Sequence, residues 1–570
     1  MRYTILFSLV LLLGCAAPKS LVGPLGAVNP YQYTVSKKVV ARHGAVASAH
    51  PLASKVGMEI MRQGGNAFDA AIATQLALAV VYPNAGNIGG GGFLVARRAS
   101  GETVALDYRE MAPSLARRDM YLDAAGNVMP GKSLNGHLAA GVPGTIAGLF
   151  ETAKYANLPF QKLIQPAIDL AEKGFVITGR EANSLNDLQA DLAKYNTVKN
   201  AFQKGIAWKS GDTLVQTDLA NTLKRVRDGG AAGFYEGTTT QLVIEEMKRG
   251  SGIITLEDMK SYQAKWRQPH TFAYKGYTVV GMPMPSSGGL LLHQMMKMVE
   301  ERPLASYGFQ SPLAVQLMVE AERRAYADRA EYMGDADFVK VPVKNLTDTA
   351  YLNSRMRDYK PGEAGSSQVI RPGKLLHESE ETTHLSVIDG AGNAVSVTTT
   401  LNNSYGSKTV VGGAGFLLND EMDDFSVKPG VPNLYGAVGG EANAIAPGKR
   451  MLSSMTPTIV LKNDKPFLVV GTPGGTTIPT SVYQTIINII DFGLNTEDAV
   501  YKPKFHHQWL PDEIAVEKTF PAAVREALQK MGYKIVERSG IGRVEAIKVL
   551  PDGSFEAVAD NRGDDAAEGW

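Results

Sequence analysis

Residues 382–402 read TTHLSVIDGAGNAVSVTTTLN, and this stretch decides the fold. Both flanks are rich in β-branched residues, and the DGAGN segment between them has the composition of a turn. A turn centred on Ala391 places Thr382 directly opposite Thr400, with their Cβ atoms about 4.5–5.5 Å apart. Asn402 follows two residues after Thr400, so we expect it on the same face. The sequence predicts two antiparallel strands that bring two hydroxyls and an amide together.

A threonine that begins a strand becomes a candidate nucleophile if the chain is cut directly before it. The cut would fall between Glu381 and Thr382, and the new α-amino group of Thr382 would serve as its own base. By itself the hairpin also fits ordinary β-sheet composition, because threonine pairs are common at the start of strands. The catalytic interpretation therefore depends on the rest of the chain.

The composition is that of a soluble globular protein with room for a large core. The chain has 570 residues, of which 44% are hydrophobic and 20% charged, and its net charge is +1. This balance gives no electrostatic reason to expect a nucleic-acid partner. The chain contains no G-x-S-x-G, no H-E-x-x-H and no cysteine pair, which argues against a hydrolase serine elbow and a zinc site. We predict no metal and no cofactor.

One segment imitates a nucleotide-binding loop. Residues 126–133, GNVMPGKS, fit the pattern G-x4-G-K-[ST]. That pattern binds phosphate only between a buried strand and a helix. The preceding residues are half charged and the following ones are poor helix formers, so we predict an ordinary loop.

The N-terminus has the pattern of an export signal. Met1-Arg2 precedes an apolar run over residues 5–13, which is too short to span a bilayer. The sequence LLGC, ending at Cys15, resembles a bacterial lipobox, and Cys15 is the only cysteine in the chain. We predict a signal over residues 1–15, a tether over 16–38 and a periplasmic protein that touches the membrane only through a lipid on Cys15. The alternative is a plain cleaved signal peptide.

Helices and strands mix along the body of the chain. We predict helices over residues 51–63 and 67–81, the second capped by Asn66 and buried because it is apolar on all sides. A strand is predicted over 93–96, and a long helix begins at Ser311-Pro312 and ends near residue 333. The polar segment 360–380 is predicted to be an exposed linker that leads to Thr382.

Three further clusters carry possible chemistry. Residues 420–424 contain four acids that suit a cation or an ammonium group, and Ser453 with Ser454 can donate to a carboxylate. An apolar strand ends at Gly474-Gly475, where exposed backbone N–H groups can form an oxyanion hole. Each cluster alone also fits a solvated loop, a strand edge or a tight turn. The pair His506-His507 is interpreted as structural, because adjacent strand residues point in opposite directions.

These motifs together resemble the γ-glutamyltranspeptidase family of the N-terminal-nucleophile hydrolases. The resemblance covers nearly the whole chain after the signal and includes GNIGGGGF at 86–93, DYREMAP at 107–113, GVPGT at 141–145, PSSGG at 285–289, TTH at 382–384, LSSM at 452–455 and PGG at 473–475. It implies an α+β fold, a four-layer αββα sandwich with two central antiparallel sheets. It also implies a large subunit, residues 39–381, and a small subunit, residues 382–570, that form one joint catalytic domain.

The resemblance implies a role for each matching residue. The chain would cut itself between Glu381 and Thr382, Thr400 would hydrogen-bond the nucleophile, and Gly474 and Gly475 would form the oxyanion hole. The glutamyl α-carboxylate would contact Arg109, Ser453 and Ser454, and the α-amino group would contact Asn402, Glu421 and Asp424. A lid over residues 429–440 would carry Tyr435 above the pocket.

The implied reaction uses glutathione and other γ-glutamyl compounds. Thr382 would form a γ-glutamyl ester, which water or an amino acid or dipeptide acceptor would resolve. Many relatives have Ser-Arg after the two glycines, whereas this chain has Thr476-Thr477, which leaves the acceptor open. Two alternatives remain: a self-cleaving acylase for another side chain, and an uncut, non-catalytic binding lipoprotein.

Overall fold

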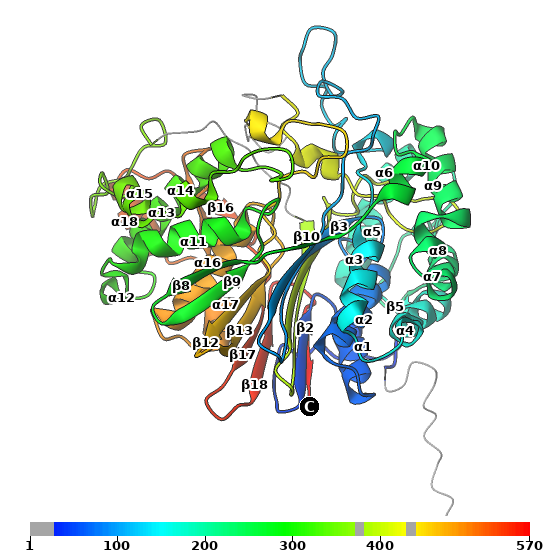
Figure 1. Ribbon diagram of the computed structural model, residues 1–570, viewed down its shortest axis with the longest axis horizontal. Helices are drawn as coiled ribbons and strands as arrows, with labels where there is room; N and C mark the ends of the chain where they lie inside the picture. Colours follow the sequence, from blue (N-terminus) through cyan, green and yellow to red (C-terminus); the bar gives the residue numbers. More distant parts are fainter. Residues whose placement is uncertain (1–27, 371–380, 429–439) are drawn as a thin grey trace, which may run out of the picture.

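Two antiparallel sheets form the centre of the molecule, for which a computed structural model describes residues 28–370, 381–428 and 440–570 (Figure 1). The first sheet has the strand order β19 (Ala566–Gly569), β2 (Gly44–Ser48), β10 (Glu381–Asp389), β11 (Ala394–Asn402), β3 (Gly91–Arg97), β4 (Thr103–Tyr108) and β7 (Lys265–Arg267). The second has the order β1 (Lys38–Ala41), β18 (Phe555–Ala559), β17 (Glu545–Val549), β13 (Lys465–Gly471), β12 (Thr458–Lys462), β9 (Tyr277–Gly281) and β8 (His270–Tyr274).

Helices cover the outer face of each sheet (Figure 1). On the first sheet's side are α1 (Pro51–Arg62), α2 (Ala67–Val81), α3 (Thr145–Thr152), α4 (Phe160–Lys173), α5 (Gly179–Asp187), α6 (Gln189–Tyr195), α7 (Thr217–Gly229), α8 (Ala232–Tyr235), α9 (Gly237–Gly250) and α10 (Leu256–Ser261). On the second sheet's side are α11 (Gly288–Glu300), α12 (Leu304–Tyr307), α13 (Pro312–Tyr332), α14 (Val343–Leu346), α15 (Thr349–Arg355), α16 (Thr477–Ile490), α17 (Thr496–Tyr501) and α18 (Ala522–Lys530).

Short elements complete the described part of the chain. They are the strands β5 (Phe175–Val176), β6 (Thr213–Leu214), β14 (Phe505–His506), β15 (Ile514–Glu517) and β16 (Ile535–Arg538), and the 3-10 turns η1 (His137–Ala139), η2 (Ala153–Tyr155), η3 (Glu421–Asp424) and η4 (Glu441–Asn443).

Separate hydrophobic cores fill the spaces between the four layers. One lies between the first sheet and helices α1, α2 and α4, and another between the second sheet and helices α11, α13 and α16. The core between the sheets contains Phe93, Val95, Ile388, Val469 and Ile547, all essentially inaccessible to solvent. Burial of apolar surface on both faces of each sheet stabilises this stack. The predicted αββα sandwich is confirmed.

The predicted helices are confirmed at their N-termini. In α2 the side chain of Asn66 accepts from the Asp69 backbone N–H, and Asp69 accepts from the Asn66 backbone N–H, which completes a capping box. Every residue of α2 is buried. Ser311 caps α13 by accepting from the Ala314 backbone N–H.

The hairpin also has the predicted register. Thr382 pairs with Thr400, and the pairing continues without a shift to Ile388 opposite Ala394. Glu381, however, pairs with Asn402, so Leu401 is an extra residue and the ladder contains a bulge next to Thr382. Bulges redirect side chains near active sites.

The prediction of an exposed linker over residues 360–380 is confirmed for most of residues 360–370, which are largely exposed, but not for Ser367 and Ile370. Ser367 is buried, its backbone N–H donates to Asp512 at 2.8 Å and its hydroxyl donates to the Trp509 carbonyl at 2.5 Å. Ile370 is buried as well. Polar and glycine-rich composition predicted exposure, but local hydrogen bonds anchor the segment. Residues 371–380 lie outside the described residues.

Several N-terminal predictions lie partly outside the described chain. Cys15 and residues 16–27 of the predicted tether are not described. From Val28 on the chain packs against the fold, because Val28 is buried and Tyr33 donates to the Val176 carbonyl at 2.6 Å. Within the described ranges, no helix is both long enough and apolar enough to cross a bilayer.

Candidate active site

Thr382 lies near the start of a central strand of the first sheet. Its side chain is almost fully buried, and β10 begins one residue before it, at Glu381. The bulge lies at the bond between these two residues. The scissile peptide that the sequence predicted is therefore held at an irregular point of the ladder, beside the hydroxyl that would attack it.

A hydrogen bond joins the Asn402 backbone to the Thr400 side chain. The Asn402 N–H donates to the Thr400 hydroxyl oxygen at 2.7 Å. Asn402 has a φ of 76°, so simple strand alternation does not extend to it. Its side-chain amide donates to the Asp420 carbonyl at 3.0 Å, next to Glu421. The Asn402 side chain therefore joins the end of β11, beside Thr400, to the acidic cluster, a contact that the sequence did not predict.

The glycine turn follows β13 and faces the same space as Thr382. Gly474 and Gly475 have φ values of 133° and 54°, and a Cβ on Gly474 would lie 2.4 Å from the Thr477 hydroxyl. The Thr477 backbone N–H and hydroxyl both donate to the Gly474 carbonyl, at 3.0 and 2.7 Å. Within the described residues, the N–H groups of Gly474 and Gly475 have no hydrogen-bond acceptor. This is the arrangement that an oxyanion hole requires.

Arg109 joins the acidic cluster in a buried ion-pair network. Its guanidinium contacts the carboxylates of Glu421 at 2.7 Å and Glu110 at 3.5 Å, and it also bonds Asp424. These side chains are almost completely buried. One guanidinium thus faces three carboxyl groups in a buried cluster.

Burial and mutual repulsion alter the acids of this network. Desolvation raises the pKa of Glu110 to about 8, although the Arg109 guanidinium opposes the shift. Burial also raises the pKa of Glu421 well above its usual value, and the pKa values of Asp420 and Asp423 to about 7 and about 6. Carboxyl groups with raised pKa values in a buried site mark a functional region.

The two predicted serines follow Met451, whose carbonyl accepts a hydrogen bond from Arg109 at 3.4 Å. The Ser453 backbone carbonyl accepts from the Ser287 hydroxyl at 2.8 Å, and its own hydroxyl accepts from the Met455 N–H at 3.1 Å. The Ser454 hydroxyl accepts from Arg329 of α13 at 3.0 Å, and Arg329 also donates to Ser287 at 3.0 Å.

Sequence reasoning did not single out Arg329 and Ser287 as site residues. The PSSGG motif at 285–289 was part of the resemblance, but Arg329 lies in the buried, charge-rich α13, where arginine is usually read as a helix-surface residue. Its full burial and its hydrogen bonds to Ser287 and Ser454 make it part of the same cluster.

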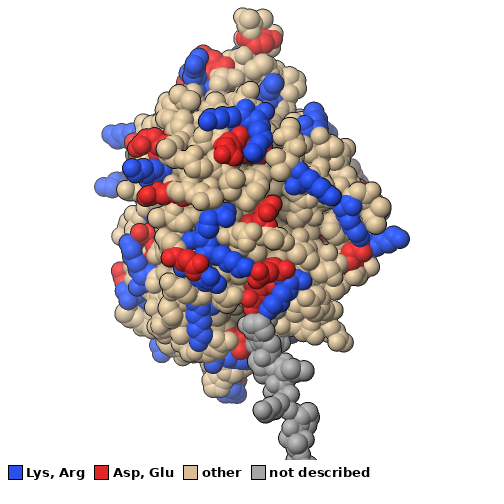
Figure 2. Space-filling model, turned by 90° about the vertical axis from the view of Figure 1, so that its right-hand side faces the viewer, with Lys and Arg blue, Asp and Glu red and all other residues tan. Residues whose placement is uncertain are grey.

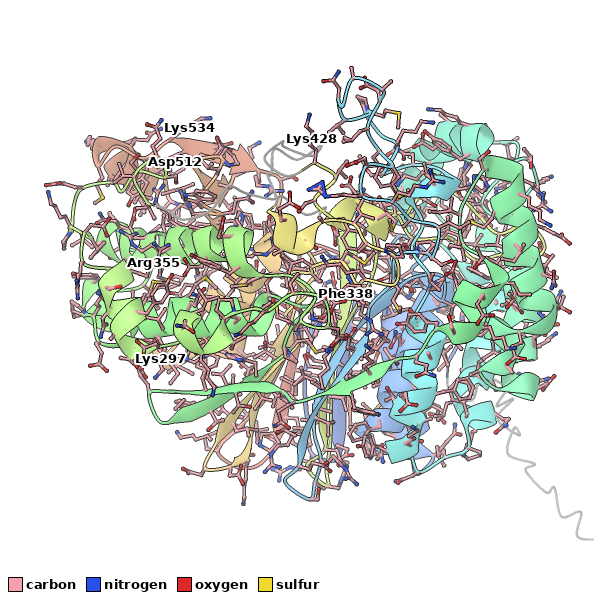
Figure 3. All side chains as sticks on the ribbon, turned by 45° about the horizontal axis from the view of Figure 1, so that its top comes forward. Lys297, Phe338, Arg355, Lys428, Asp512 and Lys534 are labelled. Carbon is pink, nitrogen blue, oxygen red and sulfur yellow. The ribbon has the colours of Figure 1, made fainter. Side chains whose placement is uncertain are left out.

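A loop over residues 114–136 covers the acidic cluster. Ser133 donates to Asp423, and Lys428 donates to the Gly126 carbonyl at 2.5 Å. Lys428, labelled in Figure 3, lies beside this loop. The P-loop-like residues 126–133 are neither preceded by a sheet strand nor followed by an α-helix, so the prediction of an ordinary loop is confirmed. Tyr435 of the predicted lid lies outside the described residues.

His384 and His506-His507 are buried inside the fold. His384 contacts the hydroxyls of Thr398 at 2.9 Å and Ser386 at 3.1 Å, between the two sheets, and burial lowers its pKa to about 3. Burial also lowers the pKa of both His506 and His507 to about 4. These rings are neutral at physiological pH and act as hydrogen-bonding core residues.

A cavity of about 430 Å³ opens beside Thr382. Thr382, Gly474 and Thr477 form part of its lining, together with side chains of α5 and of the loops near residues 82, 405 and 543. No residue of the Arg109 network lines it. The charges on the face in Figure 2 are mixed in sign, without a continuous basic patch.

A threonine near the start of a central strand of an αββα sandwich, beside a glycine turn, defines the class of N-terminal-nucleophile hydrolases. A family model described as gamma-glutamyltranspeptidase matches residues 53–570, and the chain belongs to this family. It is 48% identical over 551 residues to the glutathione hydrolase proenzyme of Escherichia coli strain K12, with 95% of each chain covered.

Solved structures agree with this assignment. A cephalosporin acylase from Bacillus halodurans superposes with a TM-score of 0.83 at 27% identity, covering 95% of this chain and 99% of that chain. A chain of the γ-glutamyltranspeptidase of Helicobacter pylori is 45% identical, with a TM-score of 0.56 over 60% of this chain and 97% of that chain. The family resemblance that the sequence suggested is confirmed.

Proposed function

We propose that this protein is a self-processing γ-glutamyl hydrolase and transferase that acts on glutathione and related compounds. The observation that carries the proposal is the position of Thr382 near the start of β10, where it lines one cavity together with Gly474 of the glycine turn. Family membership and the resemblance to glutathione hydrolase proenzymes support it.

In the first step, the Thr382 hydroxyl attacks the carbonyl carbon of Glu381. The peptide nitrogen of Thr382 leaves and takes a proton, and an ester joins Glu381 to the Thr382 oxygen. Water then hydrolyses this ester. Residues up to 381 become the large subunit and residues 382–570 the small subunit, whose new α-amino group is the base for catalysis. Its unperturbed pKa of about 7.7–8.0 suits proton transfer near neutral pH.

In the second step, the processed Thr382 hydroxyl attacks the γ-carbonyl of the substrate. The N–H groups of Gly474 and Gly475 stabilise the oxyanion, and the departing amine takes the proton that the α-amino group accepted. A γ-glutamyl ester remains on Thr382. Water or the amine of an amino acid or dipeptide resolves it and restores the hydroxyl.

Charge balance favours a zwitterionic glutamyl group as the substrate. Its α-ammonium would contact the acids beside Asn402, namely Glu421 and Asp424, which share the Arg109 guanidinium. Its α-carboxylate would contact Arg109, with hydroxyls from Ser453 and Ser454. Both ends of the amino acid would then be recognised without any contact to the leaving amine.

An acylase for an uncharged or mono-anionic side chain is the second candidate, because a cephalosporin acylase shares the fold. Such a substrate would leave the buried acids without an ammonium partner, at a large desolvation cost. The paired test is hydrolysis of a γ-glutamyl anilide against a glutaryl anilide, which lacks only the α-amino group. We expect the γ-glutamyl compound to react at least about a hundredfold faster, since a buried charged contact contributes about 3 kcal/mol. Equal rates would favour the acylase.

We also propose that the chain is exported and that Cys15 carries a lipid anchor. The charged start, the short apolar run and the lipobox-like LLGC support this location. In a cell fractionation, Cys15→Ala should move the protein from the membrane fraction to the soluble periplasmic fraction. An unchanged distribution would favour a plain cleaved signal peptide.

A further inference from the structure

The cavity beside Thr382 is lined by no residue of the Arg109 network and reaches Asp564 near the β19 edge of the first sheet, although Ser404 and Tyr405, which follow β11, also line it. In the first sheet β10 has β2 and β19 on one side and β11, β3 and β4 on the other. Arg109 directly follows β4, whereas Asp564, a cavity residue, lies two positions before β19. A γ-glutamyl group held by Arg109 therefore approaches Thr382 from one side. The other substituent of the reacting carbonyl, the leaving or incoming amine, points toward the cavity.

The cavity has the size and the walls of a small-molecule site. Its volume of about 430 Å³ falls in the range of known ligand pockets, about 300–1,000 Å³. Aromatic and aliphatic side chains form much of its wall: Tyr82, Phe175, Leu214 and Tyr405. Residues before 381 and after 382 both contribute, so the cavity is built jointly by the two predicted subunits.

Two of the three guanidinium groups along this cavity are already neutralised. Arg543 donates to both oxygens of Asp565, at 2.8 and 3.2 Å. Arg562 donates to both oxygens of Glu517, at 2.6 and 2.5 Å. These geometries are bidentate and leave the two groups firmly held.

Arg180 in the first turn of α5 differs from them. Its only counter-ion among the described residues is Asp564, at 3.9 Å, which is too long for a hydrogen bond. Asp564 is instead bound by the Thr178 hydroxyl at 3.0 Å. The Arg180 side chain is 63% exposed. The cavity therefore presents a guanidinium that can rotate onto a carboxylate ligand.

We propose that this cavity holds the amine side of the reaction, as a short peptide whose C-terminal carboxylate binds Arg180. The amine nitrogen lies at Thr382, the apolar walls contact the peptide's side chain, and the carboxylate lies at the exposed guanidinium. In glutathione this part is the cysteinylglycine leaving group. In transfer it is a dipeptide acceptor. The inference rests on the proposed function, because it needs a γ-glutamyl ester on Thr382.

The test compares glutathione with glutathione amide, in which the terminal carboxylate is a carboxamide, using the processed enzyme. Arg180→Gln should lower kcat/KM for glutathione by about tenfold, the effect of losing one charge-assisted hydrogen bond at a partly exposed site. It should leave glutathione amide and a γ-glutamyl anilide within about twofold of wild type, since neither has the carboxylate. The matched control is Arg42→Gln, an exposed arginine ion-paired to Asp552 at 3.4 Å, which should change neither substrate.

The transfer reaction to a dipeptide acceptor tests the role of Arg180 independently. With the anilide as donor, Arg180→Gln should raise the KM of glycylglycine but not that of glycylglycine amide. Equal losses on the carboxylate and carboxamide compounds, or no loss on either, would overturn the assignment of Arg180. If the proposed function itself fails, the wild-type enzyme will cleave none of the γ-glutamyl compounds, and this outcome is distinct from a loss confined to the variant.

Discussion

The two sides of Thr382 differ in how tightly their charges are organised. On the β4 side, Arg109 and three carboxyl groups are almost completely buried and contact one another directly. On the β19 side a cavity of about 430 Å³ remains, whose wall mixes apolar side chains with polar and charged ones, including the exposed Arg180. A buried ion network discriminates strongly between substrates, because a substrate that lacks a matching group leaves a protein charge unpaired. Apolar parts of a cavity wall discriminate only weakly between substrates. The comparison predicts a strict requirement for the γ-glutamyl group and a broad choice of amine.

Replacing Arg109, the cation on the side of Thr382 that selects the γ-glutamyl group, should have the largest effect on stability and activity. Arg109→Gln leaves Glu110, Glu421 and Asp424 without their shared partner, so we expect a loss of about 3–5 kcal/mol in the free energy of unfolding at pH 8. We expect kcat/KM for a γ-glutamyl anilide to fall by about a thousandfold, the effect of truncating one partner of a buried charge pair. Urea denaturation and steady-state kinetics measure the two effects.

A double variant controls for this result. Arg109→Gln with Glu421→Gln removes one charge of each sign, so it should recover part of the stability but not the activity. Full stability of Arg109→Gln alone would contradict the buried network.

The second largest effect should be a pH dependence of the free energy of unfolding that arises from Glu110, which contacts Arg109. In the folded, ligand-free protein the pKa of Glu110 is raised from 4.5 to about 8. A raised pKa means that its stabilising contribution is fully present below the unfolded value and is lost as pH rises through about 8. Between pH 7 and 9, wild type should lose roughly 1 kcal/mol more stability than Glu110→Gln.

The difference between the two proteins isolates this carboxyl group. The neutral buried histidines and Lys504, whose pKa burial lowers to about 8, are common to both. Thermal unfolding at several pH values measures the difference. Saturating glutamate should reduce it, because the α-ammonium stabilises the carboxylates. Parallel curves of stability against pH for wild type and Glu110→Gln would show that the pKa of Glu110 is not raised.

The smallest effect, on kcat alone, should come from a change beside the glycine turn at Gly474. Thr477→Val removes the hydroxyl that donates to the Gly474 carbonyl at 2.7 Å but keeps the backbone hydrogen bond. Loss of one neutral hydrogen bond of about 1 kcal/mol corresponds to a roughly fivefold fall in kcat. Thr477→Ser, which keeps the hydroxyl, should retain the wild-type rate. If valine and serine behave alike, the hydroxyl does not support the oxyanion turn.

The sequence predicted those features that depend on local patterns. The register of Thr382 opposite Thr400 followed from turn position and strand pairing, and α2 followed from its cap and its apolar length. The extra Leu401 was not predictable, because a bulge changes no composition, yet it alters the backbone at Asn402.

The assembly of the site required more than local patterns. Arg109 and Asp424 are 315 positions apart, and only the family resemblance connected them. Sequence reasoning did not single out Arg329 or Arg180, because each lies in a helix where a charged residue is unremarkable. Burial beside Ser454 distinguishes the first, and the lack of a hydrogen-bonded counter-ion within the described chain distinguishes the second.

The most direct test of the account is the mass and N-terminal sequence of the purified protein, expressed without its first 27 residues. The account predicts two chains, the smaller one beginning Thr382-Thr383-His384, and a single uncut chain for Thr382→Ala. Thr383→Val is the matched control, because the Thr383 hydroxyl is buried without a partner among the described residues, so this variant should still be cut. A single intact wild-type chain after prolonged incubation would contradict the central claim and favour a non-catalytic binding protein.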